Sequence, residues 1–151
     1  MRGPKWVGSL VVAAGTAAIV VLTAAPADAA TSPVRFAGIQ YNAPGSDTSR
    51  NVNGEYVKIT NYGGKAVTIT RWTVRDKAGH TYRFPRYTIK AHDSLWLRSG
   101  KGTHSHRTFY WGSGWHIWNN TGDTATLRNA SGTWKDSCSW SGSTSSGWKT
   151  C

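Results

Sequence analysis

A turn followed by a strictly alternating segment is the feature of this sequence that most limits its fold. The turn, Asn119–Asp123, consists of Asn, Thr, Gly and Asp, most of which favour the positive-φ or side-chain-bonded conformations of tight turns. After this turn, Ala125 and Leu127 alternate with polar neighbours. Apolar residues at every second position predict a strand with one buried face. The chain must therefore bury the apolar faces of strands against one another.

Similar alternation recurs along the chain, and no helical periodicity or fixed-period repeat accompanies it. A loop rich in Asn, Pro, Gly and Ser is expected over Asn42–Asn53, and a polar loop over Gly100–Arg107. The expected strands are Val34–Tyr41, Gly54–Asn61, a third that begins at Val67, the two arms of a hairpin around Lys77–Gly79, Tyr87–Ile89, Ser94–Ser99, Thr108–Tyr110, Asp123–Asn129 and Thr133–Trp140. Short strands separated by turns predict an all-β sandwich.

The register of the hairpin can be predicted from its apolar residues. Pairing Trp72 with Phe84 and Val74 with Tyr82 places all four on one face and leaves Lys77–Gly79 as a three-residue loop. In that loop, the glycine takes the left-handed position. A slip of one residue would bury an arginine, which is energetically forbidden. The outward face then carries Thr73, Arg75, Thr81 and Arg83.

The parity of the apolar residues changes just before this hairpin. Val67 and Ile69 are odd-numbered, whereas Trp72 and Val74 are even-numbered. Because strict alternation cannot change parity without an extra residue, a β-bulge or a bend is expected at Thr70-Arg71.

The N-terminal residues have the features of a secretory signal peptide. Arg2 and Lys5 precede the uncharged apolar run Val7–Ala25, and Ala27-Asp28-Ala29 fits the small-x-small cleavage rule. We therefore expect a signal peptide over residues 1–29 and a secreted protein, either free or associated with the cell wall. A linker over 30–33 and a single domain over 34–140 follow, with no membrane span in the mature form.

The two cysteines, Cys138 and Cys151, form an even pair in a chain with a secretory signal. A disulfide is the expected state in an oxidising compartment. It would close a Ser- and Gly-rich tail over residues 141–151, and by loop entropy it would be worth roughly 3 kcal/mol.

The net charge of the chain is +11, and removal of residues 1–29 lowers it by only one. So basic a protein favours polyanionic partners such as nucleic acid, anionic cell-wall polymers or acidic lipid surfaces. Solubility alone is the alternative explanation of the charge. The oligomeric state does not follow from these features.

Few residues are suited to catalysis or metal binding. The mature chain has a single glutamate, Glu55, so the paired carboxylates of glycosidases are not evident, and no GxSxG elbow occurs. His104 and His106 could present two imidazoles, but no other ligand-type spacing accompanies them. We therefore expect a protein that is not an enzyme and needs no metal or cofactor.

Several motifs together resemble the lamin-tail domain family. They are NAPGSD (Asn42–Asp47), NGEYVKITN (Asn53–Asn61), RWTVRDKAGHTYRFP (Arg71–Pro85), SGKGT (Ser99–Thr103), YWG (Tyr110–Gly112) and WNNTGDTATL (Trp118–Leu127). The resemblance covers Val34 to about Trp140 and implies an immunoglobulin-like β-sandwich, similar to that of small secreted bacterial members. It implies binding to nucleic acid, envelope components or other proteins. The structural positions that it implies are Glu55, Trp72, Phe84, Trp118, Asn119, Asn120, Gly122 and Asp123.

The basic residues between Arg71 and Arg107 suggest where a polyanion would bind. This stretch holds nine basic residues and two acids. Arginine binds phosphate in bidentate fashion, and an exposed tryptophan stacks on bases or sugars. The candidate polyanion-binding residues are Arg75, Arg83, Trp96, Arg98, Lys101 and Arg107. The alternative for these residues is a solvated sheet face.

The tryptophans support a second hypothesis. Exposed tryptophans on a β-sandwich can hold sugar rings by stacking. The candidates for such a glycan or cell-wall site are Trp111, Trp115, Trp140 and Trp148, and local packing against the C-terminal tail is their alternative role. A third hypothesis is a structural role in a cell-surface assembly.

Overall fold

The computed structural model describes residues 31–151, so the expected signal peptide lies outside the described residues. A 3-10 turn, η1, spans Val52–Gly54. The strands are β1 (Val34–Gln40), β2 (Tyr56–Asn61), β3 (Val67–Thr68), β4 (Thr73–Arg75), β5 (Thr81–Arg83), β6 (Thr88–Ile89), β7 (Ser94–Arg98), β8 (Thr108–Tyr110), β9 (Gly122–Arg128), β10 (Trp134–Ser141) and β11 (Trp148–Thr150). In this part of the chain, no helix has the length and apolar character needed to cross a membrane.

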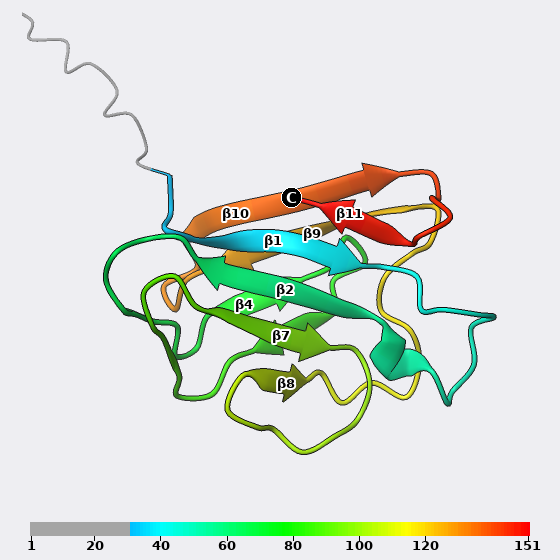
Figure 1. Cartoon of the computed structure of the whole chain (residues 1–151), viewed down its shortest axis with the longest axis horizontal. Coiled ribbons are helices and arrows are strands. Elements are labelled where there is room, and N and C mark those ends of the chain that lie inside the picture. The colour runs from blue at the N-terminus through cyan, green and yellow to red at the C-terminus, as the bar shows by residue number, and fades with distance from the viewer. Residues whose placement is uncertain (1–30) are drawn as a thin grey trace, which may run out of the picture.

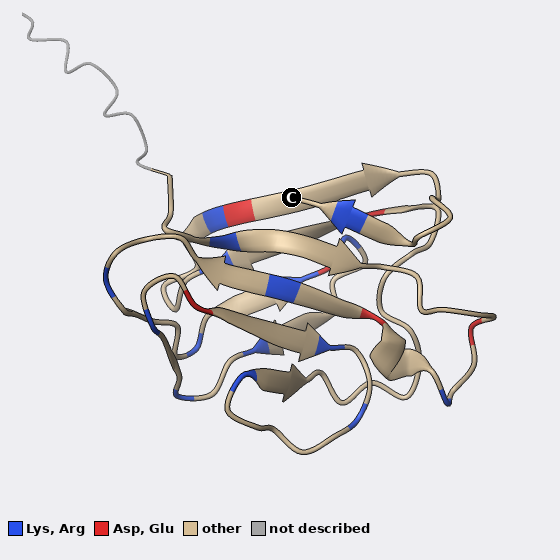
Figure 2. Ribbon diagram, viewed as in Figure 1, with Lys and Arg blue, Asp and Glu red and all other residues tan. Residues whose placement is uncertain are grey.

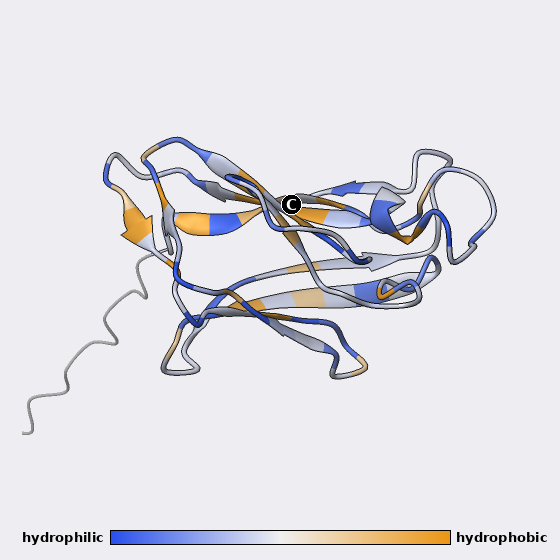
Figure 3. Cartoon of the chain, turned by 90° about the horizontal axis from the view of Figure 1, so that it is seen from below, coloured by the Kyte–Doolittle hydropathy of each residue, from blue (hydrophilic) through white to orange (hydrophobic). Residues whose placement is uncertain are grey.

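The strands form two main sheets that pack face to face (Figures 1 and 3). The first sheet has the order β11-β1-β2-β7-β8, and the second has the order β10-β9-β4-β5. The short strands β3 and β6 pair separately. Neighbouring strands are antiparallel except for β7 and β8, which are parallel. The predicted all-β sandwich is confirmed.

The inward-facing side chains of both sheets fill one core, which contains a continuous series of aromatic rings. Tyr41 stacks on Trp140 with ring centres 5.0 Å apart, and Trp140 meets Trp118 at 5.9 Å. From Trp118 the series continues through Trp111 to Tyr82, again with 5.9 Å between ring centres. Large aromatic side chains bury much apolar area and pair edge to face, so this series joins the two sheets.

The hairpin β4–β5 has the predicted register. Val74 pairs with Tyr82, and the backbone N–H of Phe84 donates to the carbonyl of Trp72 at 2.9 Å. Gly79 has a φ of +105°, in the region that favours glycine. Immediately before the hairpin, the predicted bend is present, because Arg71 has a φ of 62°.

Three local features of the fold were not predicted. A bulge in β1 between Phe36 and Gly38 shifts its register against β2, so that Phe36 and Ile39 are both buried. The 3-10 turn η1 lies at the end of the expected loop Asn42–Asn53. Strand β11 lies in the C-terminal tail and pairs antiparallel with the second half of β1.

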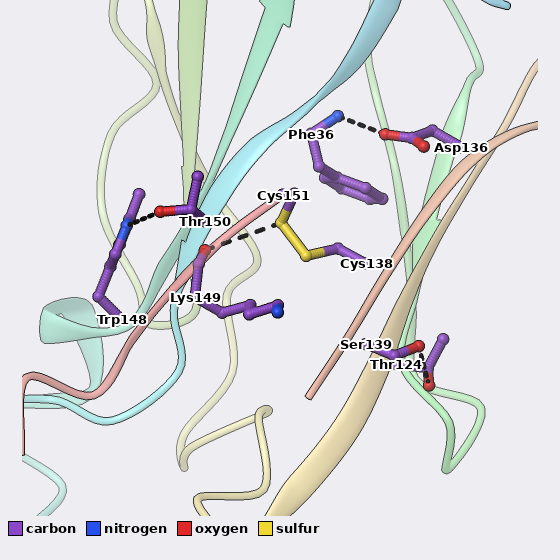
Figure 4. Close-up of a disulfide and its surroundings, with 9 residues drawn as sticks. All are labelled: Phe36, Thr124, Asp136, Cys138, Ser139, Trp148, Lys149, Thr150 and Cys151. Atoms are coloured by element: carbon purple, nitrogen blue, oxygen red, sulfur yellow. Dashed lines mark hydrogen bonds between the residues drawn. A yellow bond between two sulfur atoms is a disulfide. The ribbon is translucent and has the colours of Figure 1, made fainter. Parts of the chain in front are cut away.

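The disulfide between Cys138 and Cys151 is present, as predicted, and connects the two sheets (Figure 4). Cys138 lies on the inward face of β10, and Cys151 directly follows β11. The backbone N–H of Cys151 also donates to the carbonyl of Ala37 at 3.3 Å, which continues the β1–β11 ladder. The bridge therefore attaches a three-residue strand in which Trp148 is the one residue that is not exposed.

Candidate functional site

The outer surface of the β10-β9-β4-β5 sheet carries three exposed arginines, and we call it the arginine face. Its register places Arg128 of β9 opposite Thr73 of β4, which lies opposite Arg83 of β5. Arg75 lies two residues further along β4. Adjacent strands are about 4.8 Å apart, so the Cα atoms of Arg83 and Arg128 are separated by roughly 10 Å. The backbone positions of the three arginines therefore lie close together, while Arg83 donates to the carbonyl of Arg71 at 3.4 Å and Arg128 to that of Gly132 at 2.9 Å.

The acids near the arginine face are used elsewhere in the fold. Asp76 is 4% exposed and accepts hydrogen bonds from backbone amides at the hairpin loop. Asp123 is 3% exposed and accepts from the backbone N–H of Lys77 at 3.0 Å. Asp136 accepts from the backbone N–H of Phe36 at 2.8 Å. Asp76 also contacts Nδ1 of His80 at 2.6 Å, and within residues 31–151 none of these carboxylates forms an ion pair with Arg75, Arg83 or Arg128.

An exposed tryptophan borders the arginine face. Trp134 of β10 lies opposite Arg128 in the register and is 54% exposed. Trp134 was not among the predicted site residues, because it lies near the start of the last expected strand and its outward direction depends on the β10 register. The bulge after Trp134 in β10 makes that register hard to predict.

The structure divides the sequence-predicted polyanion site. Arg75 and Arg83 lie on the arginine face, whereas Trp96 and Arg98 lie on β7, on the outer surface of the other sheet. The expectation of one shared face is therefore wrong. Alternation shows which residues point outward, but it does not show to which sheet a strand belongs, and the outer faces of a sandwich point in opposite directions. Lys and Arg accordingly appear on both layers (Figure 2).

The remaining candidates are in the segment that joins β7 to β8. Arg107 forms an ion pair with Asp93 at 2.9 Å, and within residues 31–151 this is the only such pair that includes Lys or Arg. Lys101 is exposed and lines a cavity of about 320 Å³ between three loops. Neither residue contributes to the arginine face.

The outer surface of the first sheet is rich in aromatic and basic side chains, and we call it the aromatic face. Arg98 lies over the Tyr56 ring, 5.5 Å from its centre, and donates to the carbonyl of Asn53 at 2.6 Å. The ammonium group of Lys58 lies 5.5 Å from the centre of the Trp96 ring. These side chains are half-buried by one another, so each cation already has an aromatic partner.

The four tryptophans proposed for glycan binding have different environments. Trp140 is buried in the core at 9% exposed, and Trp111 packs against the core. Trp148 packs against Tyr56 at 6.0 Å between ring centres, whereas Trp115 is 54% exposed. For Trp140 and Trp111 the expectation of an exposed stacking surface is therefore wrong, because both pack in or against the core.

The turn before β9 is organised by Asp123. Its carboxylate accepts from the backbone N–H of Asn119 at 3.1 Å and from that of Thr124 at 2.7 Å. Asn119 in turn accepts from the indole N–H of Trp140 at 2.9 Å. Nearby, Asn120 donates to Asp47 at 3.1 Å, and Gly122 has a φ of +148°.

The other structural positions that the family resemblance implies include Trp72, Phe84 and Trp118, and all three side chains are buried in the core.

Comparison with protein-family models gives one match, the Lamin Tail Domain, over residues 27–142. The chain belongs to the lamin tail domain family. No curated protein matches it. The family consists of non-enzymatic immunoglobulin-like domains and suggests a role in protein interaction. The matched region includes both sheets except for β11, which follows it in the sequence.

In this lamin tail domain, Glu55 is fully buried and connects two distant segments. One carboxylate oxygen accepts from the backbone N–H of Ile117 at 3.0 Å, and the other lies 3.0 Å from Nδ1 of His116. Burial raises the pKa of Glu55, and the Ile117 amide, Ser99 and His116 lower it by a smaller amount. The opposite ring nitrogen of His116 contacts the carbonyl of Thr48 at 3.2 Å.

Proposed function

We propose that this lamin tail domain binds phosphate-bearing polyanions through its arginine face. The observation that carries the proposal is the register that places Arg75, Arg83 and Arg128 together, while the nearby carboxylates bind backbone amides. A guanidinium group can bind two oxygens of one phosphate at once. Binding also releases the counterions of the polyanion, so the affinity falls as the salt concentration rises. Trp134, at the border of the face, offers a ring for stacking on a base or sugar.

The test is a salt titration of binding to duplex DNA and to a poly(glycerol phosphate) wall polymer, with a neutral glycan as the third arm. Arg75→Glu combined with Arg83→Glu should lower the slope of log affinity against log salt by about two, because each phosphate contact contributes about 0.9. Thermal stability should not change, because both side chains point into solvent. The two polyanion arms distinguish nucleic acid from a wall polymer.

The matched control is Lys65→Glu combined with Lys90→Glu. These lysines are exposed on loops outside the arginine face, and the change in net charge is the same. If both double variants lost affinity for the polyanion equally, overall charge and not the arginine face would determine the affinity. Binding of neither polyanion by the unaltered protein would reject the proposal.

Glycan binding through the aromatic face is the second candidate function. It is supported by a row across the first sheet in which Trp148, Tyr56 and Tyr110 come from alternate strands, with Gln40 and Arg98 between them. Aromatic rings in such a row stack on sugar rings. Neutral-glycan binding that is insensitive to salt and is lost in Tyr56→Ala, but not in Arg75→Glu with Arg83→Glu, would support this candidate over the first.

A further inference from the structure

Three loops border a polar cavity of about 320 Å³ that is open to solvent. Its walls come from the segment around η1, from the loop after β7 and from the segment after β8. Small-molecule sites in proteins have volumes of about 300–1,000 Å³, so this cavity is large enough for one small ligand. It is separate from the arginine face, and the family comparison assigns nothing to it.

The charge of the lining favours an anion. Arg50 and Lys101 both line the cavity, and no acidic residue does. Within residues 31–151, neither cation forms an ion pair. Among the nearby carboxylates, Asp47 accepts from Asn120 at 3.1 Å and Glu55 is fully buried. Two basic groups therefore face the same small space without a compensating charge.

Hydrogen bonds hold the walls of the cavity in place. The side-chain amide of Asn53 donates to the carbonyl of Lys101 at 2.8 Å, which connects the η1 segment to the loop after β7. The backbone N–H of Ser113 donates to the carbonyl of Ser99 at 3.1 Å and so joins the third segment. Gly100 permits this closure, because a Cβ at that position would lie 2.5 Å from Asn53 Oδ1. A preformed site loses less entropy when a ligand binds.

The remaining lining groups are suited to a hydroxylated ligand. Ser49 provides a hydroxyl group, and Ser113 provides an acceptor oxygen whose own proton is donated to the carbonyl of Trp115. The side-chain amide of Asn53 is bonded to the carbonyl of Lys101 and so belongs to the wall. Val52 provides an apolar contact. Trp115, which is 54% exposed, follows the lining residues Ser113 and Gly114 in the chain. Hydroxyl and amide groups with a few apolar atoms are the partners that a sugar ring requires, and the two cations add a preference for negative charge.

We propose that this cavity binds a single anionic sugar, which is a sugar ring that carries a phosphate or a carboxylate group. Arg50 and Lys101 contact the anionic group, and the hydroxyl oxygens of Ser49 and Ser113 accept from the ring hydroxyls. A sugar phosphate and a sugar acid share this chemistry, so either can be the natural source of the ligand.

The test is a titration of the ¹⁵N-labelled, disulfide-bonded protein with glucose 1-phosphate, glucuronate, glucose and inorganic phosphate, followed by NMR. At least one anionic sugar should shift the amide signals of Lys101, Ser113 and Gly114 with saturation. Glucose alone and phosphate alone should bind more weakly, because each provides only half of the contacts. The two anionic sugars distinguish phosphate from carboxylate. The proposal would be overturned if neither glucose 1-phosphate nor glucuronate shifted these amide signals.

Two variants assign the contacts. Arg50→Gln and Lys101→Gln should each weaken binding by about tenfold, as expected for the loss of one charge-assisted hydrogen bond. Lys65→Gln is the matched control, since this lysine is exposed on a different loop. Equal effects of all three would overturn the proposal. Arg75→Glu with Arg83→Glu should leave sugar binding unchanged, so this site and the arginine face can fail independently.

Discussion

The carboxylate of Glu55 accepts a hydrogen bond from the backbone N–H of Ile117, 62 residues further along the chain, at 3.0 Å. This bond fixes the Trp-rich segment between β8 and β9 to the start of β2, and the backbone N–H of Trp118 approaches the same oxygen at 3.4 Å. A buried carboxylate is expensive unless donors face it. In this domain, the donors are provided by the loop whose Ile117 and Trp118 side chains pack into the core.

The first prediction concerns the pH dependence of this contact. Burial raises the pKa of Glu55 from 4.5, so the folded protein holds the proton more tightly than the unfolded chain does. The contribution of Glu55 to the free energy of unfolding is therefore greatest below pH 4.5 and is lost as the pH rises through the higher folded-state pKa. Glu55→Gln keeps an acceptor for Ile117 but does not titrate.

The measurement is urea unfolding of both proteins at a series of pH values from below 4.5 upward. The free energy of unfolding of the unaltered protein should fall relative to that of Glu55→Gln as the pH increases through this window. Parallel pH profiles would contradict the prediction.

A second prediction follows from the packing of Trp148 over Gly38. A Cβ at position 38 would overlap the indole ring, so the ring occupies the space that any other residue would need. Gly38→Ala should displace Trp148 and weaken the β1–β11 pairing, at a cost of about 1–3 kcal/mol in unfolding free energy, as for other overpacked sites. Thermal unfolding measures the loss, and a red shift of tryptophan fluorescence reports exposure of the ring.

Gly64→Ala provides the control for this substitution. Nothing lies within 4 Å of a Cβ at position 64. The same chemical change should therefore be nearly neutral there. Equal stability of Gly38→Ala and Gly64→Ala would mean that Trp148 moves aside without cost.

Much of the fold could be predicted from the sequence, because alternation reports burial directly. The hairpin register is an example: only one pairing keeps Trp72, Val74, Tyr82 and Phe84 on the same face, and that pairing is present. Strand β11 could not be predicted in this way. It has three residues, of which Lys149 and Thr150 are exposed, and its order depends on pairing with β1 and on the disulfide.

The arrangement of the candidate site was harder to predict, since it depends on contacts between distant strands. Arg83 and Arg98 both point outward, but β5 and β7 lie in different sheets. Arg128 joins the arginine face only because β9 pairs with β4. No local pattern carries that information, so the sequence alone predicted a basic surface and could not define its members.

A third prediction concerns the disulfide. The bridge joins residues 13 apart, and loop entropy predicts a contribution of about 3 kcal/mol. Reduction, or Cys138→Ala with Cys151→Ala, should lower the free energy of unfolding by up to this amount. Hydrogen exchange should become faster in β11 and in its partner residues Gly38–Gln40. The exchange rates of backbone amides that bond between β2 and β7 should change much less.

Agreement between the reduced protein and the double alanine variant controls for the chemistry of the thiols. If β11 kept its protection from exchange in both, pairing with β1 and the packing of Trp148 would suffice to hold the tail. The disulfide would then stabilise the protein only by lowering the conformational entropy of the unfolded chain.

The last prediction concerns the bend before β4, where Arg71 has a φ of 62°. This left-handed conformation costs a residue with a Cβ about 1 kcal/mol, whereas glycine adopts it freely. The contacts of the bend involve the backbone, since the N–H of Arg71 donates to the carbonyl of Phe84 at 2.9 Å. Arg71→Gly should therefore be more stable than Arg71→Ala by about 1 kcal/mol in urea unfolding.

Both Arg71 variants lose the same positive charge beside Arg83, so a difference between them isolates the backbone. Arg83 donates from Nη1 to the carbonyl of Arg71 at 3.4 Å, and that acceptor persists in each variant. Their affinities for a polyanion should accordingly be equal even though their stabilities differ. Equal stabilities would show that the bend is not strained, and unequal affinities would show that the conformation of the bend affects the position of Arg83.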